Sequence, residues 1–274
     1  MRPEMLDRMN RFREEALAGG VPSAEVERWL EAARPCATLA STVDGPVVGH
    51  FGGPDLLPAD APQLPAGLRL IAMLDLAALP DDATTLALPP DGRLLFFARL
   101  HPDDLGASGR VMYVPAGTPL DERPGGDGHD RAELRLKYDL SLPDNEVLVD
   151  PVEHPHAKEL RQAWSDVLHE DGHDRDETHL QIDGYSRDAY GEDDPITASA
   201  AMAARRAGKP EGRRASPWAR PRPDDWALLA QWYGGALDFG NLRIGGDVFW
   251  TIARKDVKVR RFDQATVLGC FAGP

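Results

Sequence analysis

Short apolar segments bounded by turn residues constrain the fold more than any other feature of this 274-residue sequence. They have the length of strands rather than helices, and they form an early and a late pair: 68–74 with 94–100, and 226–233 with 247–253. The 26 glycines and 24 prolines supply the turns that many short elements need. The sequence therefore predicts an α+β fold with a mostly antiparallel sheet.

The early and late pairs also resemble each other. In the early pair an apolar strand, 70–75, precedes an aromatic strand that follows Gly92; in the late pair, 228–232 precedes an aromatic strand that follows Gly246. Duplication of one unit would explain this pattern, and so would chance, because apolar strands after glycine turns are common. We predict two similar halves that share one core.

Helical periodicity occurs in three places. Apolar residues recur on one helix face in 4–17, in 23–33 and again in 157–169. We therefore divide the chain into an N-terminal helical preface, residues 1–35, and an α+β domain, residues 36–274, which contains one central helix.

Charge is strongly segregated along the chain. The sequence has 31 basic and 45 acidic residues, a net charge of −14. Eleven acidic residues and two arginines fall within 165–194, whereas seven basic residues and one glutamate fall within 205–222. We predict a charged, mobile loop at 186–224. The net charge argues against nucleic acid, and the separate charged segments favour a protein partner.

The sequence contains no signal for a membrane or a secretory route. No apolar stretch approaches the ~20 residues of a membrane-spanning helix. Residues 1–15 are charged where a signal peptide would be apolar. Cys36 and Cys270 are too few for a disulfide scaffold. We expect a soluble, cytoplasmic, acidic protein with no membrane partner.

Blocks of sequence between about Val48 and Phe271 resemble the YwqG-like family, a bacterial domain of unknown function. The blocks are Gly52-Gly53-Pro54 with Leu57-Pro58, 70–80, Leu88-Pro89 with 92–97, His179 with Gly184-Tyr185, 226–231 and 246–250. The resemblance implies an α+β fold with extensive antiparallel sheet and no established activity. Some members lie near toxin and immunity loci, which suggests an immunity or regulatory role through protein binding.

The sequence departs from the family pattern in three places. The family usually has glutamine before the aspartate of its first strand motif, whereas this chain has Met73-Leu74-Asp75 and keeps the glutamine only at Gln231. Residues 237–240 replace the family's late tryptophan-and-aspartate turn, and the basic segment 205–222 looks like an addition.

Candidate binding residues lie mostly in the family-like blocks: His179, Tyr185, Gln231, Trp232, Trp250 and Asp75. A histidine beside a turn either satisfies buried carbonyl groups or acts as a general base. The tryptophans build a core or, with Phe97, line a ligand pocket. Asp75 is a solvated turn residue or part of a carboxylate cluster with Asp238 and Asp247.

A second set of candidates would hold a divalent metal. His169, His173 and Asp176 lie in the His/Asp/Glu-rich segment 169–179, and imidazole and carboxylate groups suit zinc or manganese. The simpler interpretation of this segment is a hydrated acidic loop. No serine or cysteine lies in a nucleophile motif.

We therefore predict a non-catalytic, protein-binding module of the YwqG-like type, with no cofactor. The alternatives are a metal-assisted hydrolase that uses 169–179 and a small-ligand sensor whose pocket is lined by Trp232, Trp250 and Phe97.

Overall fold

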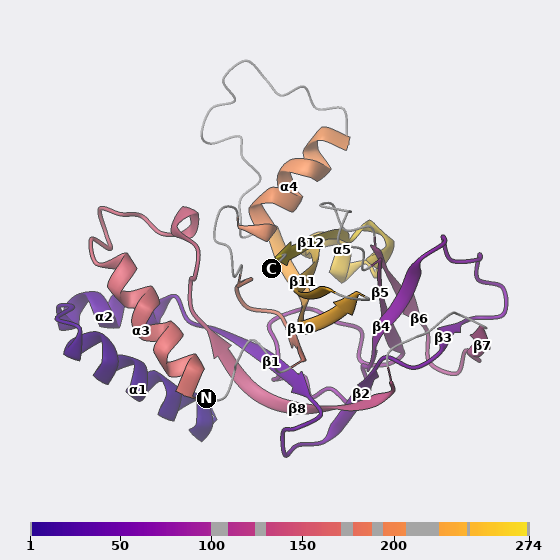
Figure 1. Ribbon diagram of the computed structural model, residues 1–274, viewed down its shortest axis with the longest axis horizontal. Helices are drawn as coiled ribbons and strands as arrows, with labels where there is room; N and C mark the ends of the chain where they lie inside the picture. Colours follow the sequence, from indigo (N-terminus) through magenta and orange to yellow (C-terminus); the bar gives the residue numbers. More distant parts are fainter. Residues whose placement is uncertain are drawn as a thin grey trace.

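The protein is described here by a computed structural model that places residues 2–99, 109–123, 130–170, 178–187, 194–206, 225–239 and 242–272 (Figure 1). Its α-helices are α1 (Pro3–Ala18), α2 (Ser23–Glu31), α3 (Ala157–Glu170), α4 (Pro195–Arg206) and α5 (Arg254–Lys258). The first strands are β1 (Arg34–Ala40), β2 (Val47–Phe51), β3 (Asp55–Leu57), β4 (Leu68–Asp75), β5 (Arg93–Arg99) and β6 (Gly109–Val114). The remaining strands are β7 (Asp121–Arg123), β8 (Ala132–Ser141), β9 (His179–Ile182), β10 (Trp226–Phe239), β11 (Leu242–Ala253) and β12 (Thr266–Ala272).

One antiparallel sheet organises the molecule and curls into a nearly closed barrel (Figure 1). Its ten strands follow the order β12-β11-β10-β9-β1-β8-β2-β4-β5-β6, and β3 pairs separately with β7. The two end strands, β6 and β12, come into contact, so that a Cβ atom on Gly109 would lie 2.7 Å from a methyl group of Val267. The Trp250 indole N–H also donates to the Phe97 carbonyl oxygen at 3.1 Å, linking β11 to β5.

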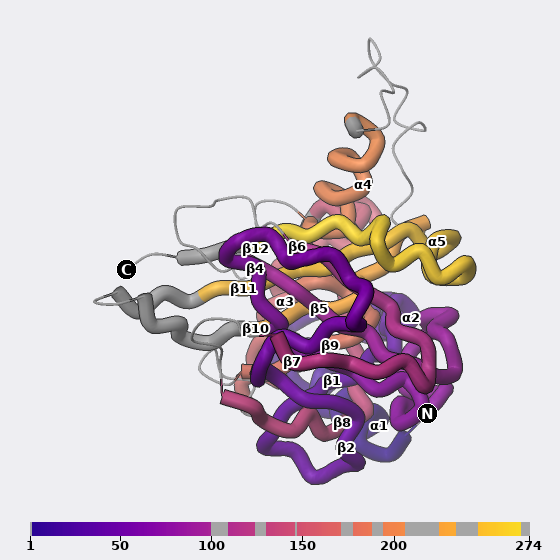
Figure 2. The backbone as a smooth tube through the Cα atoms, turned by 90° about the vertical axis from the view of Figure 1, so that its right-hand side faces the viewer, coloured from indigo at the N-terminus to yellow at the C-terminus, as the bar shows by residue number. Residues whose placement is uncertain are grey.

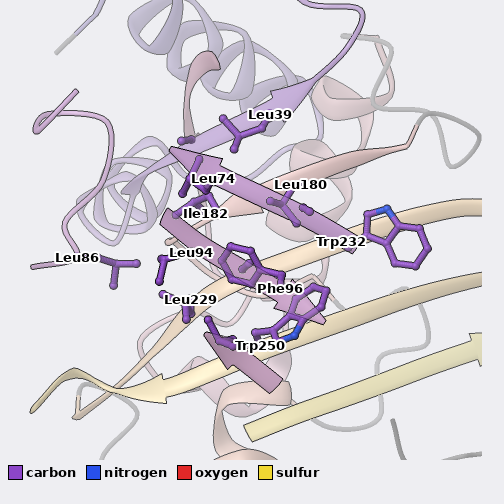
Figure 3. Close-up of a cluster of buried hydrophobic side chains, with 14 of the residues drawn as sticks. Leu39, Leu74, Leu86, Leu94, Phe96, Leu180, Ile182, Leu229, Trp232 and Trp250 are labelled. Carbon is purple, nitrogen blue, oxygen red and sulfur yellow. The ribbon is translucent and has the colours of Figure 1, made fainter. Parts of the chain in front are cut away.

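The early and late apolar strands share one core, as the sequence predicts (Figure 3). The rings of Phe96 from β5 and Trp250 from β11 meet edge to face, with centroids 5.4 Å apart. Phe51 from β2 stacks on Trp232 from β10 at 5.5 Å. Both tryptophans are almost completely buried, and removal of such large apolar surfaces from water is the main driving force for closing the barrel.

The two ends of the sheet repeat the same strand register. In β4 and β5, Leu70 opposes Phe97 and Ala72 opposes Phe96, with one extra residue between the two pairs. In β10 and β11, Leu228 opposes Thr251 and Ala230 opposes Trp250, with the extra residue at the same place. The turns that follow β2 and β9 match as well, since each begins with two residues at positive φ: Gly52 (60°) and Gly53 (87°), and Asp183 (67°) and Gly184 (82°).

The first strand of each half is exchanged with the other half. The chain runs through β1, β2, β4, β5 and β6, and then through β8, β9, β10, β11 and β12. However, β1 pairs with β9, β8 pairs with β2, and β1 and β8 pair with each other at the centre of the sheet. This exchange interlocks the halves, so we do not divide the sheet into two domains.

The N-terminal helices cover part of the outer surface. They pack with α3 and the end of β8 in a second apolar cluster that contains Phe12, Trp29, Leu140 and Trp164. Arg8 of α1 forms a buried ion pair with Asp139 of β8, and the Thr38 hydroxyl donates to the same carboxylate at 2.9 Å. The helical preface is thus attached to the barrel by both apolar and charged contacts.

The structure corrects one sequence prediction. Helix α4 lies inside 186–224, which we had predicted as a loop from its charges, and it stands out from the body in Figure 2. Ile196 and Ala200 anchor α4 on β10 and β11, and this packing outweighs the local polarity. Residues 188–193 and 207–224 lie outside the described part.

The predicted strands at 68–74 and 94–100 and the helix at 157–169 are confirmed within one residue, and the predicted strands at 226–233 and 247–253 lie within the longer β10 and β11. Among the described helices, none is both long enough and apolar enough to cross a membrane.

Candidate functional site

A group of polar side chains gathers on the outer face of the second half, between α3, the end of β8 and strands β9 to β11. We call it the Arg187 cluster: Asp144, Ser165, His179, Arg187, Gln231, Tyr233 and Asp247. Alternation along the strands places these side chains outside, since Leu180, Trp232 and Val248 point into the barrel core. His179, Tyr233 and Asp247 lie side by side on three neighbouring strands.

Gln231 fixes the backbone of Arg187. Its side-chain oxygen accepts the Arg187 backbone N–H at 2.9 Å, and its amide nitrogen donates to the Arg187 carbonyl oxygen at 2.6 Å. Gln181 supports the turn before it by donating to the carbonyl oxygens of Asp183 at 2.8 Å and Tyr185 at 2.9 Å. Two buried or half-buried glutamines therefore hold residues 183–187 against the sheet.

The Arg187 side chain reaches back toward the helical layer. Its Nε atom lies 3.4 Å from a carboxylate oxygen of Asp144, and its Nη2 donates to the Ser165 hydroxyl at 3.3 Å. The side chains of Arg187 and Asp144 keep 32% and 21% of their surfaces exposed. This ion pair is accessible from solvent, unlike the Arg8–Asp139 pair.

An aromatic stack borders the cluster. The His179 and Tyr233 rings lie nearly parallel, 19° apart in plane, with centroids 4.1 Å apart. Burial raises the pKa of Tyr233 well above its ordinary value; Asp247 and Asp144 add to this rise, and Arg187 opposes it. At neutral pH the Tyr233 hydroxyl therefore stays protonated and can donate a hydrogen bond.

The start of α4 is joined to the same turn. Asp194 caps the helix, accepting the Thr197 backbone N–H at 2.8 Å and the Thr197 hydroxyl at 2.7 Å. The other oxygen of Asp194 accepts the Ser186 hydroxyl at 2.9 Å. Ser186 is thus engaged in holding α4 beside Arg187.

The other predicted binding residues lie apart from this cluster or serve the core. The Tyr185 side chain points to the helical layer, where its hydroxyl donates to the Ala32 carbonyl at 3.0 Å. Trp232 and Trp250 fill the barrel interior together with other apolar side chains (Figure 3). Asp75 lies in the first half and accepts the Ala77 backbone N–H at 3.1 Å, as a turn residue does.

The predicted metal ligands are only partly within the described chain. His169 is exposed at the end of α3, whereas His173 and Asp176 lie outside the described residues. Within the described residues, no three His, Cys, Asp or Glu side chains come close enough together to hold a metal ion. Burial raises the pKa of Cys36 to about 12, so its thiol is protonated at neutral pH.

Sequence reasoning identified His179 and Gln231 but not Arg187, Asp144, Ser165 or Tyr233 as members of one site. Arg187 and Gln231 are 44 residues apart, and only the pairing of β9 with β10 brings them together. The available signal was Arg187 itself, which directly follows the Gly184-Tyr185-Ser186 element.

Comparison with known proteins assigns the chain to one family. No curated protein matches the sequence. The model of a family described as "Domain of unknown function (DUF1963)" matches residues 49–270, which include the Arg187 cluster and most of the barrel but not β1. Since the match covers far more than half of the sequence, the chain belongs to the DUF1963 family.

Proposed function

We propose that this protein is a cytoplasmic binding module of the YwqG-like type that captures a protein partner through the Arg187 cluster. The observation that carries the proposal is the difference between the two halves of the barrel at equivalent positions. If the halves are repeats of one unit, the first half indicates which residues the backbone itself requires.

The first half builds the same strand register without the cluster. Met73 takes the position of Gln231, since each is the next residue after the matched alanine in its strand, and Arg93 takes the position of Asp247. The outer face around Met73 is an apolar cluster with Leu70, Leu95 and Phe97. The β3–β7 pair lies against β4 here, and Leu57 of β3 belongs to the cluster.

Polar residues in the second half are therefore an addition to the fold rather than a requirement of it. A buried glutamine costs free energy unless both of its polar ends are satisfied, and an apolar residue at the equivalent position avoids that cost. Polar groups retained against such a cost are candidates for function.

The composition of the cluster suits a protein interface. Arginine and tyrosine are over-represented among the residues that contribute most to binding between proteins. The acidic segment 165–194 includes part of the cluster, and the basic segment 205–222 follows α4, whose first turn is tied to Ser186. Complementary charged surfaces promote selective association of proteins.

Structural roles account for the reactive side chains near the cluster. The Ser141 hydroxyl oxygen accepts the Tyr185 backbone N–H at 2.9 Å, and Ser186 is bonded to Asp194. The Cys36 thiol is buried and protonated. These assignments favour binding over nucleophilic catalysis.

Co-purification at low salt tests the proposal. The full chain, isolated from its native host, should retain a protein partner identified by mass spectrometry. The Arg187→Ala variant should lose that partner, whereas a Met73→Leu variant in the equivalent region of the first half should keep it. Retention of the same protein by Arg187→Ala at equal yield and stability would contradict the proposal.

A further inference from the structure

We infer that the Arg187 cluster recognises a single carboxylate group of the partner, and that Gln231 is a positioning residue that presents Arg187 to it. The inference rests on the proposed function and names the chemical group that the site accepts.

The side chain of Gln231 holds the backbone of Arg187 by two hydrogen bonds. Gln231 is fully buried, and both polar ends of its side chain bond to the backbone of Arg187. Neither end contacts the guanidinium group, so the effect of Gln231 on a ligand would act through the position of Arg187. Fixing a binding residue in advance reduces the entropy lost on association.

The guanidinium group retains capacity for an acceptor. Arginine has five N–H donors, and the contacts to Asp144 and Ser165 engage Nε and Nη2 at the long distances of 3.4 and 3.3 Å. Within the described residues, Nη1 makes no hydrogen bond, and a third of the side chain is exposed. The remaining donors at the end of the group match the two oxygens of a carboxylate.

Neighbouring charges restrict the kind of anion. Asp144 lies 3.4 Å from Arg187, and Asp247 lies opposite Tyr233 on the neighbouring strand. A carboxylate already paired with the arginine disfavours a doubly charged phosphate more than a singly charged carboxylate. The net charge of −14 likewise repels a polyanion at long range. A lone carboxylate at a chain terminus or on an acidic side chain satisfies these conditions.

Arginine side-chain NMR on the full chain tests the inference. The Arg187 Nε–H signal is assigned by its loss in Arg187→Lys. The probes are N-acetylglycine, which mimics a chain terminus, acetyl-glutamate amide, which carries a side-chain carboxylate, and acetyl-glutamine amide as the uncharged match. We expect the first or the second to shift the Arg187 signal saturably, and the stronger of them identifies the source of the carboxylate.

Variants of Gln231 separate positioning from stability. Gln231→Met, which installs the residue found at the equivalent place in the first half, should weaken carboxylate binding by about tenfold, as expected for losing roughly one charge-assisted hydrogen bond. Its melting temperature is measured alongside. Gln231→Glu can accept the Arg187 N–H through one oxygen and, when its buried carboxyl group is protonated, donate to the Arg187 carbonyl through the other, so it should recover part of the affinity. Its melting temperature is measured as well, so that affinity is compared only between folded variants. Met73→Leu should leave the affinity for the carboxylate unchanged.

Three results overturn the inference: no shift with either carboxylate, an equal shift with the uncharged amide, or unchanged affinity in both Gln231 variants. Capture of a protein partner without a carboxylate response would refute this inference and leave the proposed function standing. A carboxylate response in a protein that captures no partner would refute the proposed function and leave this inference standing.

Discussion

Replacement of Arg8 by methionine should destabilise the protein far more than removal of an exposed arginine from the same helix. Arg8 and Asp139 are each only 4% exposed. Without Arg8, the Asp139 carboxylate would keep its hydrogen bonds from the Thr38 hydroxyl at 2.9 Å and the Leu140 N–H at 2.7 Å, but it would lose the ion pair with Arg8. Removing one member of a buried ion pair typically costs about 3–5 kcal/mol.

The expected change is large enough to measure by thermal unfolding. For a chain of this size, about 1 kcal/mol corresponds to roughly 2–4 °C, so Arg8→Met should lower the melting temperature by roughly 6–20 °C. Arg13→Met is the matched control, because Arg13 pairs with Glu27 at 2.6 Å while 33% and 55% of their side chains remain exposed. Such surface pairs contribute about 0–1 kcal/mol.

A second replacement tests the mechanism. In Arg8→Met with Asp139→Asn, the amide oxygen still accepts the Thr38 hydroxyl and no buried charge is left. This double variant should recover at least half of the stability that Arg8→Met loses. The reasoning fails if Arg8→Met melts within about 2 °C of Arg13→Met, or if the double variant is less stable than the single one.

Three further predictions concern other buried groups. Burial alone would raise the pKa of Glu25, but hydrogen bonds and charge from His156 outweigh it and lower the pKa. The stabilisation is therefore present above pH of about 4.5 and lost as the pH falls through the lowered pKa, so urea unfolding between pH 5 and pH 3 should show a smaller stability loss in Glu25→Gln. The Cys36 thiol, with its pKa of about 12, should resist iodoacetamide at pH 8 until the protein unfolds, and rapid alkylation of native protein would disprove its burial. Gly184 has φ of 82°, and a Cβ atom there would lie 2.3 Å from the Ser141 hydroxyl oxygen, so Gly184→Ala should lower the free energy of unfolding by more than about 1 kcal/mol in denaturant. Gly117 also has a positive φ, but no atom lies within 4 Å of a Cβ atom there. An equal loss in Gly117→Ala would show that backbone strain, and not the clash with Ser141, causes the loss at Gly184.

Local sequence patterns predict several strands because those strands are nearly continuous apolar runs. The segments 68–74 and 226–233 are buried on both faces, so period and length are enough to identify them. Strand β9 is only four residues long and follows an acidic segment. Its sequence alone does not predict a strand, because the run is too short to show a clear alternation. The charges that flank helix α4 predict a loop, whereas Ile196 and Ala200 pack against β10 and β11 and stabilise a helix.

The sequence predicts where strands occur better than it predicts which strands pair with each other. Nothing local in β1 indicates that it pairs with β8 and β9 rather than with β2, which follows it in the chain. The members of the Arg187 cluster come from five elements of the fold, and their proximity depends on this exchange. The sequence indicates His179 and Gln231 as candidates, but it does not indicate Arg187, to which Gln231 is hydrogen-bonded.

The two halves of the barrel provide an internal comparison that a single sequence seldom offers. His50 and Gln181 occupy matched positions beside Met73 and Gln231, and each donates to a carbonyl oxygen of the turn that follows: Gly52 at 3.1 Å and Asp183 at 2.8 Å. This shared bond serves the fold, because both halves need the turn. The next strand differs, since Met73 is apolar while Gln231 reaches across to Arg187. Because the first half keeps the same strand register with methionine at this position, the register does not require the contact to Arg187, and exchange of Gln231 for methionine tests what that contact serves.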